Sequence, residues 1–366
     1  MKIQRAQIKW WLVNLTINLI LWNFLLLVEY SLGYLIYPEF GVGGAKVFRV
    51  IHRNIGFIPL IASLFAIILW LLEDVAFHKY FMKQGIFKGL ILRFSSSILI
   101  YVTSIVLISI LYYQGRFDSF AEYLPLLKVF INNRATLYLF ILITVISMFV
   151  NFVKIIIQNT GLKLFLPVIM GYYRKPKEET RIFIFIDLIS STKYAEVLGH
   201  KKYSAFLQKC FQFLGMLEIK YHAVQYQIVG DEVVLTWSAN DPRNYLFAVN
   251  FYYEFISILK NETNNFMHKF GIVPEFTASI NSGKIMVTEV GSLKSEIAFH
   301  GDVLNTAARI QKQCKNLNRN LLVTKTFAQI FAPIAEDYKV EWLCNKILLG
   351  KKLETEIFAI DPKIEF

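Results

Sequence analysis

Four long apolar runs fill most of the first 160 or so residues of this 366-residue chain. They lie at roughly 11–31, 55–73, 94–113 and 136–157. Each run is close to the ~20 residues that a helix needs to cross a bilayer, where helices satisfy their backbone hydrogen bonds internally. Hydrophobic residues make up 55% of the chain and charged residues 18%, more apolar than a typical soluble protein. The sequence therefore predicts an α-helical transmembrane domain with four spans over residues 1–158.

Basic residues are distributed unevenly around these runs. They are denser before the first run, between the second and third, and after the fourth, which is typical of cytoplasmic segments. We therefore expect a multi-pass protein of the inner (plasma) membrane, with the lipid bilayer as a partner and the C-terminal domain in the cytoplasm. This flanking charge accounts for much of the net charge of +12. Since no basic stripe with interleaved aromatics is present, nucleic acid is not an expected partner.

Three asparagines, Asn14, Asn18 and Asn23, interrupt the first apolar run. Their amides would be costly against lipid, so we expect them to face other helices. Packing contacts between helices are the favoured interpretation, and a ligand or ion site is the alternative.

The character of the sequence changes near residue 160. Residues 159–180 read as a connector broken by glycine and proline, and residues 181–362 alternate short apolar runs with helical patterns. Strands are expected at 181–187, in the hairpin 224–237, as two strands joined around Gly283 within 276–291, and in the tail 338–360. Helices are expected at 192–219, at 243–260 and at 301–314, the last with Asp302 as its N-cap. Hairpins between helices predict an α+β domain of the ferredoxin-like kind.

Two carboxylates stand where strands of this domain end. Asp187 closes the apolar run RIFIFID, and Asp231 follows Gly230 at the tip of the hairpin VQYQIVGDEVVLTW. In a ferredoxin-like sheet these strands are neighbours, so both acids could hold a pair of Mg²⁺ or Mn²⁺ ions for a nucleotide's phosphates. Ser191 and Thr192 open the next helix, whose N–H groups attract phosphate. The alternative is that both acids are solvated turn residues.

Four motifs, FIDLISST, VGDEV, SGKIMVTEVG and HGDVLNTAARI, occur in the order and at about the spacing of class III nucleotidyl cyclases, the adenylyl and guanylyl cyclases. Roughly residues 180–360, about half of the chain, resemble the catalytic domain of that family. The resemblance implies that the ribose 3′-hydroxyl attacks the α-phosphate, giving a 3′,5′-cyclic nucleotide and pyrophosphate. It also implies a homodimer, because each active site is shared between two facing domains.

The resemblance further implies roles for individual residues. Asp187 and Asp231 correspond to the family's two metal ligands, and the backbone carbonyl of Leu188 to an additional one. Asn305 and Arg309 correspond to the transition-state pair. Because they are four residues apart they share one helix face, where Arg309 can supply charge to the phosphorus and Asn305 can hold the ribose.

Three further positions concern the terminal phosphates and the base. Lys351, in LGKK, resembles the family's late lysine that contacts the terminal phosphates, and a solvated turn lysine is the alternative. Gln227 stands where adenylyl cyclases carry a base-reading lysine, and Ala298 where they carry Asp or Thr. Gln227 keeps hydrogen-bonding groups and the Ala298 side chain has none. These two residues therefore leave three alternatives for the base of the substrate: adenine, guanine or a pyrimidine.

Together these features predict a membrane-anchored nucleotidyl cyclase for intracellular signalling, with ATP as the first expected substrate and two Mg²⁺ or Mn²⁺ ions per site. The alternatives are a GTP or pyrimidine preference, or a catalytically weak or silent receptor or scaffold with a cyclase fold. VGDEV also resembles the GGDEF turn of diguanylate cyclases. Val229 and Val233 replace that motif's first glycine and its phenylalanine, and the HGDVLNTAARI helix has no counterpart there, which disfavours this interpretation.

Overall fold

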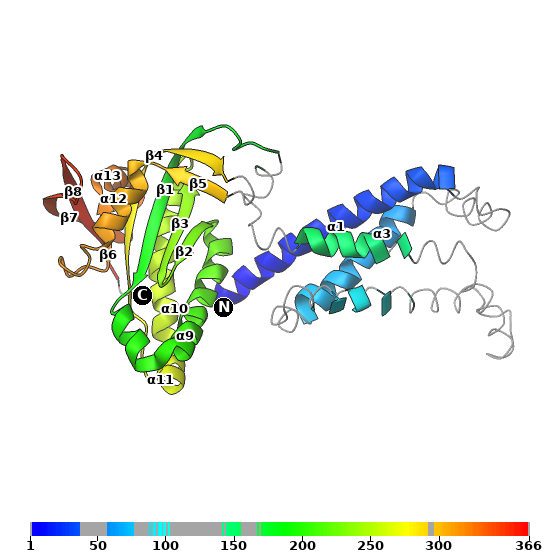
Figure 1. The fold of residues 1–366 in the computed structure, drawn as a ribbon, viewed down its shortest axis with the longest axis horizontal. Helices are drawn as coiled ribbons and strands as arrows, with labels where there is room; N and C mark the ends of the chain where they lie inside the picture. The colour runs from blue at the N-terminus through cyan, green and yellow to red at the C-terminus, as the bar shows by residue number, and fades with distance from the viewer. Residues whose placement is uncertain are drawn as a thin grey trace. The chain divides into compact units, whose positions relative to one another are not determined.

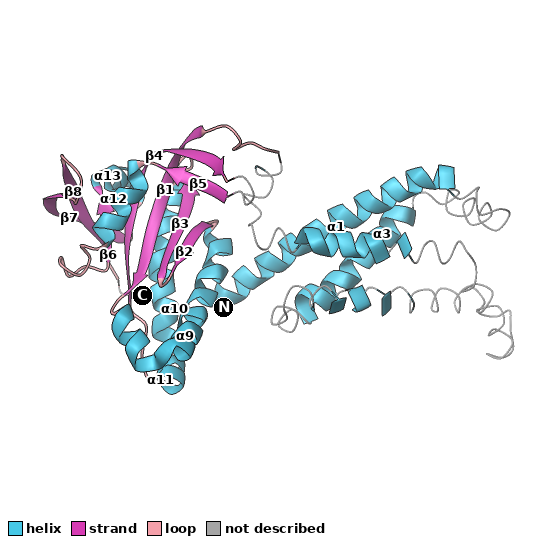
Figure 2. Ribbon diagram, viewed as in Figure 1, coloured by secondary structure: helices cyan, strands magenta, loops and turns pink. Residues whose placement is uncertain are grey.

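The computed structural model of this chain describes residues 2–36, 57–76, 141–142, 144–154, 170–291 and 296–364, with residue 167 and short stretches between 88 and 102. The chain divides into two compact units, which we call the helical unit (Ile8–Thr160) and the α+β unit (Met1–Gln7 with Gly161–Phe366). Their elements are labelled in Figure 1 and coloured by type in Figure 2.

The helical unit contains most of helix α1. Its described elements are α1 (Lys2–Ile36), α3 (Phe57–Trp70), the π-helical turn η2 (Leu71–Ala76) and a helical segment at 144–154. Its buried apolar cluster consists of Trp22, Ala66, Leu69, Ile146 and Val150. These residues come from α1, α3 and the 144–154 segment, so helix packing closes a small core of its own.

Polar side chains also lie inside the helical unit. Asn18 Nδ2 donates a hydrogen bond to Asp74 Oδ2 at 3.5 Å, and Lys154 Nζ lies 2.7 Å from the same oxygen. Asn23 Nδ2 donates to Ser63 Oγ of α3 at 3.1 Å. The expectation that asparagines of the first run face other helices is confirmed for Asn18 and Asn23.

No helix among the described residues is both long enough and apolar enough to cross a membrane. Helix α3 has 14 residues, fewer than the ~20 of a span. Helix α1 has 35 residues, but asparagines interrupt its apolar run. The predicted four-span transmembrane domain over 1–158 is therefore wrong, and so is the multi-pass inner-membrane location. The bilayer partner that followed from them has no support in the described residues. Most of the predicted span 94–113 and parts of 136–157 lie outside the described residues.

One eight-stranded sheet organises the described residues of the α+β unit. Its strands are β1 (Lys177–Leu188), β2 (Val224–Val229), β3 (Glu232–Ser238), β4 (Phe276–Val290), β5 (Glu296–His300), β6 (Leu321–Thr324), β7 (Tyr338–Ile347) and β8 (Glu354–Pro362). The order across the sheet is β2-β3-β1-β4-β6-β8-β7, with β5 paired to β4. Strands β4 and β6 run parallel, and the other neighbouring pairs are antiparallel.

Helices cover both faces of this sheet (Figure 1). They are α9 (Ser191–Tyr221), α10 (Arg243–Asn261), α11 (Thr263–Phe270), α12 (Asp302–Gln311), α13 (Lys325–Phe331) and the short η3 (Ala332–Ile334). Strand β1 is buried on both sides because its residues alternate. Ile182, Ile184 and Ile186 pack with α9 and α10, while Phe183 and Phe185 pack in the smaller cluster that includes Ala307 of α12. This double burial explains why β1 is a continuous apolar run.

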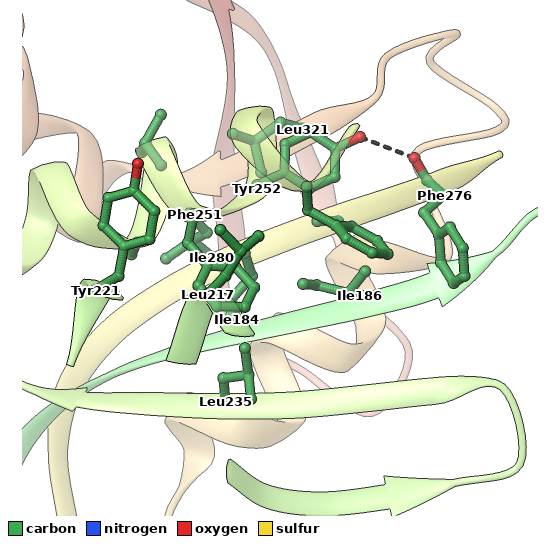
Figure 3. Packing of buried hydrophobic residues seen from close by; sticks show 14 of the residues in the cluster. Ile184, Ile186, Leu217, Tyr221, Leu235, Phe251, Tyr252, Phe276, Ile280 and Leu321 are labelled. Atoms are coloured by element: carbon green, nitrogen blue, oxygen red, sulfur yellow. Dashed lines mark hydrogen bonds between the residues drawn. The ribbon is translucent and has the colours of Figure 1, made fainter. Parts of the chain in front are cut away.

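The larger of the two clusters, on the α9 and α10 face, is shown in Figure 3. Ile184 and Ile186 of β1 and Ile280 of β4 meet aromatic and aliphatic side chains of the helices there. The Tyr252 hydroxyl donates a hydrogen bond to the Phe276 carbonyl at 2.8 Å, so its polar end is satisfied inside the core.

The predicted α+β architecture is confirmed, and two local details differ. Strand β4 runs unbroken from Phe276 to Val290, so the predicted turn at Gly283 is wrong. A Cβ atom at Gly283 would lie 2.9 Å from Val303 Cγ2, so this glycine allows α12 to approach the sheet closely. Helix α12 is capped by Gly301, so the predicted N-cap role of Asp302 is also wrong.

Phe251→Ala tests the larger cluster. Phe251 is fully buried and its ring packs edge-on against Tyr221 and Trp237. The cavity should lower the free energy of unfolding by about 3–5 kcal/mol, measured by denaturant titration of the full chain. The matched control is Ile330→Ala at an exposed position, which should lower the free energy of unfolding by less than about 0.5 kcal/mol. Equal losses in the two variants would contradict this description of the core.

Candidate active site

Asp187 and Asp231 meet at the C-terminal end of β1. Strand β3 pairs antiparallel with β1, with Ile186 opposite Val233, so the turn before β3 lies beside Asp187. Gly230 forms that turn with a φ of 63°, which glycine adopts at little steric cost. Backbone pairing thus brings together two acids that are distant in the sequence.

The Asp231 carboxylate perturbs that of Asp187. The pKa of Asp187 is raised from 3.8 to about 6, first by burial and then by the negative charge of Asp231. The pKa of the neighbouring Glu232 is also raised, first by burial and then by Asp187, while Lys312 opposes the shift. A partly buried pair of like charges is stabilised by a counter-charge, so this is a place where a cation would bind.

The donor set at this position fits a hard divalent ion. Mg²⁺ and Mn²⁺ are bound by carboxylate, carbonyl and water oxygens, commonly with only one or two carboxylates from the protein. No group of three or more His, Cys, Asp and Glu side chains that could hold a metal ion occurs in the described part of the chain. The fit therefore depends on Asp187 and Asp231, with the remaining ligands supplied by backbone, water or substrate oxygens.

Helix α9 begins beside the two acids. Its N-cap residue Ser190 has a left-handed φ of 59° and forms no side-chain cap, so the helix begins with N–H groups that attract anions. Ser191 is half-buried and Thr192 is exposed. The pKa of Tyr203 in α9 is raised by burial and then by Asp231 and Asp187, while its hydrogen bond with Ser191 lowers it. Tyr203 therefore lies close to the acids, which nothing in its sequence context indicated.

Helix α12 is joined to strand β4 by a row of polar contacts, which we call the β4–α12 seam. It comprises Thr277, Ser279 and Asn281 of β4 with Gln311, Ala307 and Val303 of α12. Ser279 Oγ donates to the Ala307 carbonyl at 2.6 Å, and Asn281 Nδ2 donates to the Val303 carbonyl at 3.0 Å. The seam pairs every second residue of β4 with every fourth residue of α12. Two residues advance about 6.6 Å along a strand and four residues about 6 Å along a helix, so successive pairs stay aligned.

Gln311 closes the seam at the carboxylate pair. Its Nε2 donates to Thr277 Oγ1 at 3.2 Å and to Asp187 Oδ2 at 3.2 Å. This residue was not identified from the sequence, although a polar side chain two residues after Arg309 in the motif helix was a weak signal.

Asn305 and Arg309 lie on α12 as predicted, near a second group of polar residues. Asn305 is exposed and Arg309 is half-buried under the β7–β8 turn. A Cβ atom at Gly350 would lie 3.3 Å from Arg309 Nη2. Lys351 Nζ of the same turn lies 2.7 Å from Asp302 Oδ2, and this lysine holds the pKa of Asp302 below its ordinary value.

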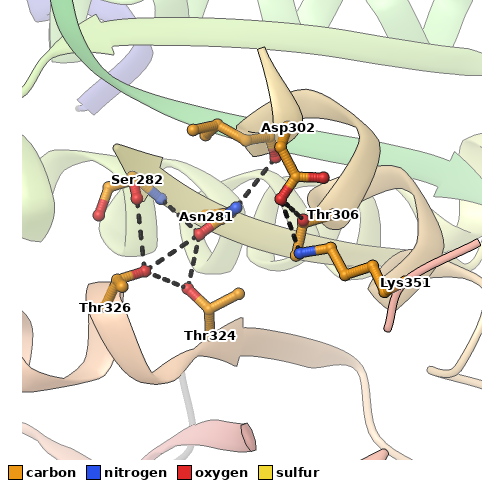
Figure 4. A network of polar contacts seen from close by, with 8 residues as sticks. Asn281, Ser282, Asp302, Thr306, Thr324, Thr326 and Lys351 are labelled. Carbon is orange, nitrogen blue, oxygen red and sulfur yellow. Dashed lines mark hydrogen bonds and ion pairs between the residues drawn. The ribbon is translucent and has the colours of Figure 1, made fainter. Parts of the chain in front are cut away.

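A polar cleft of about 350 Å³ opens beside the start of α12. Asn281 Oδ1 accepts hydrogen bonds from Thr324 Oγ1 at 2.7 Å and from Thr326 Oγ1 at 3.2 Å (Figure 4). The paired Lys351 and Asp302 side chains also line this cleft. Asn281 thus binds both α12 and the strand β6 side of the cleft, which fixes the start of α12.

The predicted site residues fall into two groups within one chain. Asp187, Asp231 and Ser191 form the carboxylate group, and Arg309 with Lys351 forms the basic group. No hydrogen bond or ion pair between described residues links the two groups directly.

The two positions assigned to base recognition lie outside these groups. Gln227 is exposed in β2 next to a β-bulge, opposite Val234. Ala298 is half-buried in β5, opposite Thr288 of β4. Gln227 is therefore accessible to a ligand, while Ala298 presents only its methyl and backbone groups.

Comparisons with known proteins agree with this fold. No protein-family model matches the sequence. The chain is 30% identical over 182 residues to Adenylate cyclase 2 of Rhizobium meliloti (strain 1021), a match that covers 50% of this chain and 50% of that protein. This chain therefore spans about half the length of that curated relative.

Two solved structures illustrate the structural similarity. A bacterial light-regulated adenylyl cyclase superposes with a TM-score of 0.52 at 15% identity, over 63% of this chain and 67% of the other. The guanylate cyclase domain of RhGC from Catenaria anguillulae, in complex with GTP, superposes with a TM-score of 0.44 at 19% identity, over 51% of this chain and 98% of the other. The first likeness shows that this chain shares a fold with adenylyl cyclases.

Asp187→Asn should stabilise the metal-free protein, and more so at high pH. The folded-state pKa of about 6 exceeds the ordinary 3.8, so the folded chain binds this proton more tightly than the unfolded one. The free energy of unfolding therefore falls as pH rises through this range, and removing the charge should restore on the order of 1 kcal/mol, allowing for screening of a partly exposed group.

This is measured by denaturant unfolding with a chelator present, at about pH 4 and about pH 8. The control is Asp241→Asn, because Arg243 lowers the pKa of exposed Asp241 and its removal should give no gain at either pH. An Asp187→Asn effect of the same size at both pH values would contradict the raised pKa of Asp187.

Proposed function

We propose that the α+β unit is a class III nucleotidyl cyclase domain, which converts a nucleoside triphosphate into a 3′,5′-cyclic nucleotide and pyrophosphate. The observation that carries this proposal is the pairing of Asp187 with Asp231 at the end of β1, beside the start of α9. Carboxylates next to a helix N-terminus suit phosphates that arrive with divalent ions. The match to Adenylate cyclase 2 and the shared fold support the same reaction.

Two Mg²⁺ or Mn²⁺ ions would supply Lewis-acid stabilisation of the phosphate charge and acidify the ribose 3′-hydroxyl. Asp187 and Asp231 would hold them, with the backbone carbonyl of Leu188 as a further oxygen. The raised pKa of Asp187 in the metal-free protein is consistent with this role, because burial and the neighbouring Asp231 both disfavour its ionised form when no cation is bound.

The phosphate chain would be oriented by groups at both ends. The N–H groups at Ser191 and Thr192 bind phosphate oxygens at the start of α9. Lys351 exchanges its partner Asp302 for the terminal phosphates, a change that needs only one side chain to move. Arg309 stabilises the charge on the pentavalent phosphorus, and Asn305 holds the ribose.

A complete site would require two copies of the chain. The carboxylate group and the basic group are separate within one chain, and Asn305 is exposed, as a residue that serves a partner should be. A symmetric dimer brings each group against its complement twice, which gives two shared sites. The resemblance to class III cyclases implies the same homodimer.

ATP is the proposed substrate, following the similarity to Adenylate cyclase 2. Gln227 would take part in base reading, because it is exposed and its amide both donates and accepts hydrogen bonds. Position 298 would contribute backbone groups only. GTP or a pyrimidine triphosphate is the alternative that these two residues keep open.

The proposal is tested by incubating the full chain with Mn²⁺ and each of the four nucleoside triphosphates. A cyclic product is expected from ATP. Asp231→Ala should lower the rate by more than about 100-fold, since even residues that only support metal ligands account for 10–100-fold. Its unfolding midpoint should not fall, because a turn acid contributes little to stability and its removal relieves the repulsion of Asp187. No cyclic product from any triphosphate would favour a silent scaffold and contradict the cyclase.

Complementation tests the shared site. Full chains carrying Asp187→Ala or Arg309→Ala should each be inactive alone, because each variant damages both sites of its own dimer. A mixed dimer keeps one undamaged site and should recover about half the wild-type activity per dimer, as two-fold symmetry requires. Mixed dimers are isolated with two different affinity tags. Inactive mixed dimers would show that the metal ligands and Arg309 act from the same chain.

A further inference from the structure

The side-chain amide of Gln311 is almost fully enclosed. Gln311 is 5% exposed, and its Nε2 donates to both Asp187 Oδ2 and Thr277 Oγ1 at 3.2 Å. A side-chain amide nitrogen has two N–H groups, so both are used. An ionised carboxylate only accepts hydrogen bonds, which makes the nitrogen the end of the amide that faces Asp187.

The strand register explains why one amide reaches both acceptors. Asp187 of β1 and Thr277 of β4 are directly opposite each other in the β1–β4 pairing, so their side chains leave the sheet on the same face. Helix α12 packs on this face, and Gln311 is its last residue. The buried Thr277 hydroxyl fixes the amide, and the amide in turn limits the rotation of the Asp187 carboxylate.

We propose that Gln311 is a positioning residue, which holds the Asp187 carboxylate in its metal-binding orientation and ties it to helix α12. The inference rests on the proposed function, because it takes Asp187 as a metal ligand. A carboxylate held by a hydrogen bond to one oxygen presents its other oxygen and remaining lone pairs in a fixed direction. Hydrogen-bond partners of metal ligands commonly act in this way.

The contact also links the two groups of site residues. The β4–α12 seam fixes α12 along β4 at Val303, Ala307 and Gln311, and Asn305 and Arg309 lie between these points. In the proposed dimer this helix serves the partner's site while Gln311 holds a metal ligand of its own chain. Gln311 therefore connects the metal ligand of one site to the transition-state residues of the other.

Gln311→Met tests the inference, since methionine has a similar length and favours helix but cannot donate a hydrogen bond. Mn²⁺ affinity of the nucleotide-free full chain is measured by electron paramagnetic resonance of free Mn²⁺. Gln311→Met should weaken it about 10–100-fold, and the Mn²⁺ concentration for half-maximal rate should rise by the same factor. The matched control is Gln313→Met, because Gln313 accepts from Lys346 and Asn316 and does not contact Asp187. Its Mn²⁺ affinity should equal that of the wild type.

Thr277→Val provides a second measurement that keeps the core volume. It removes the hydroxyl that fixes the Gln311 amide and should weaken Mn²⁺ binding about 5-fold. If Gln311→Met does not fold, Thr277→Val serves as the test in its place. If the folded variants bind Mn²⁺ as tightly as the wild type does, the positioning role is overturned and the cyclase proposal is unaffected. A wild-type chain that binds no Mn²⁺ and forms no cyclic product overturns both.

Discussion

Two like charges are held together at the end of β1 because backbone pairing sets their separation. Asp187 and Asp231 repel each other, and burial of Asp187 adds to the cost. The pair persists because β1 is hydrogen-bonded on both edges and packed on both faces, an arrangement far stronger than one repulsion. The destabilised Asp187 carboxylate is therefore a consequence of a very stable strand, which is a common arrangement at functional sites.

The β4–α12 seam carries this constraint to helix α12. Short polar side chains of β4 reach the carbonyls of α12, and Gly283 leaves the space for the helix to come close. The helix is thus fixed by directed hydrogen bonds in addition to apolar packing, which allows sliding more readily. Asn305 and Arg309 acquire a defined position from contacts made by their neighbours.

Sequence reasoning succeeded where a local pattern reports the environment directly. Alternation and turn residues predicted β1, the β2–β3 hairpin and strands in the tail that forms β7 and β8, because strand burial and glycine turns leave short-range signals. It failed for the four membrane spans, since the length and composition of an apolar run do not say where a helix begins or ends. It also misread Gly283 as a turn, because a glycine needed for close helix approach looks the same in sequence.

The sequence by itself determined the chemical inventory of the candidate site: Asp187, Asp231, the start of α9, and Asn305 with Arg309 at helical spacing. These lie in contiguous motifs, so their types and local geometry follow from short-range rules. Only the tertiary structure decided that Gln311 donates to both Asp187 and Thr277, and that Arg309 lies at the β7–β8 turn whose Lys351 pairs with Asp302. Such contacts depend on strand register and on how a helix docks against a sheet, and both are set by packing between segments distant in the sequence.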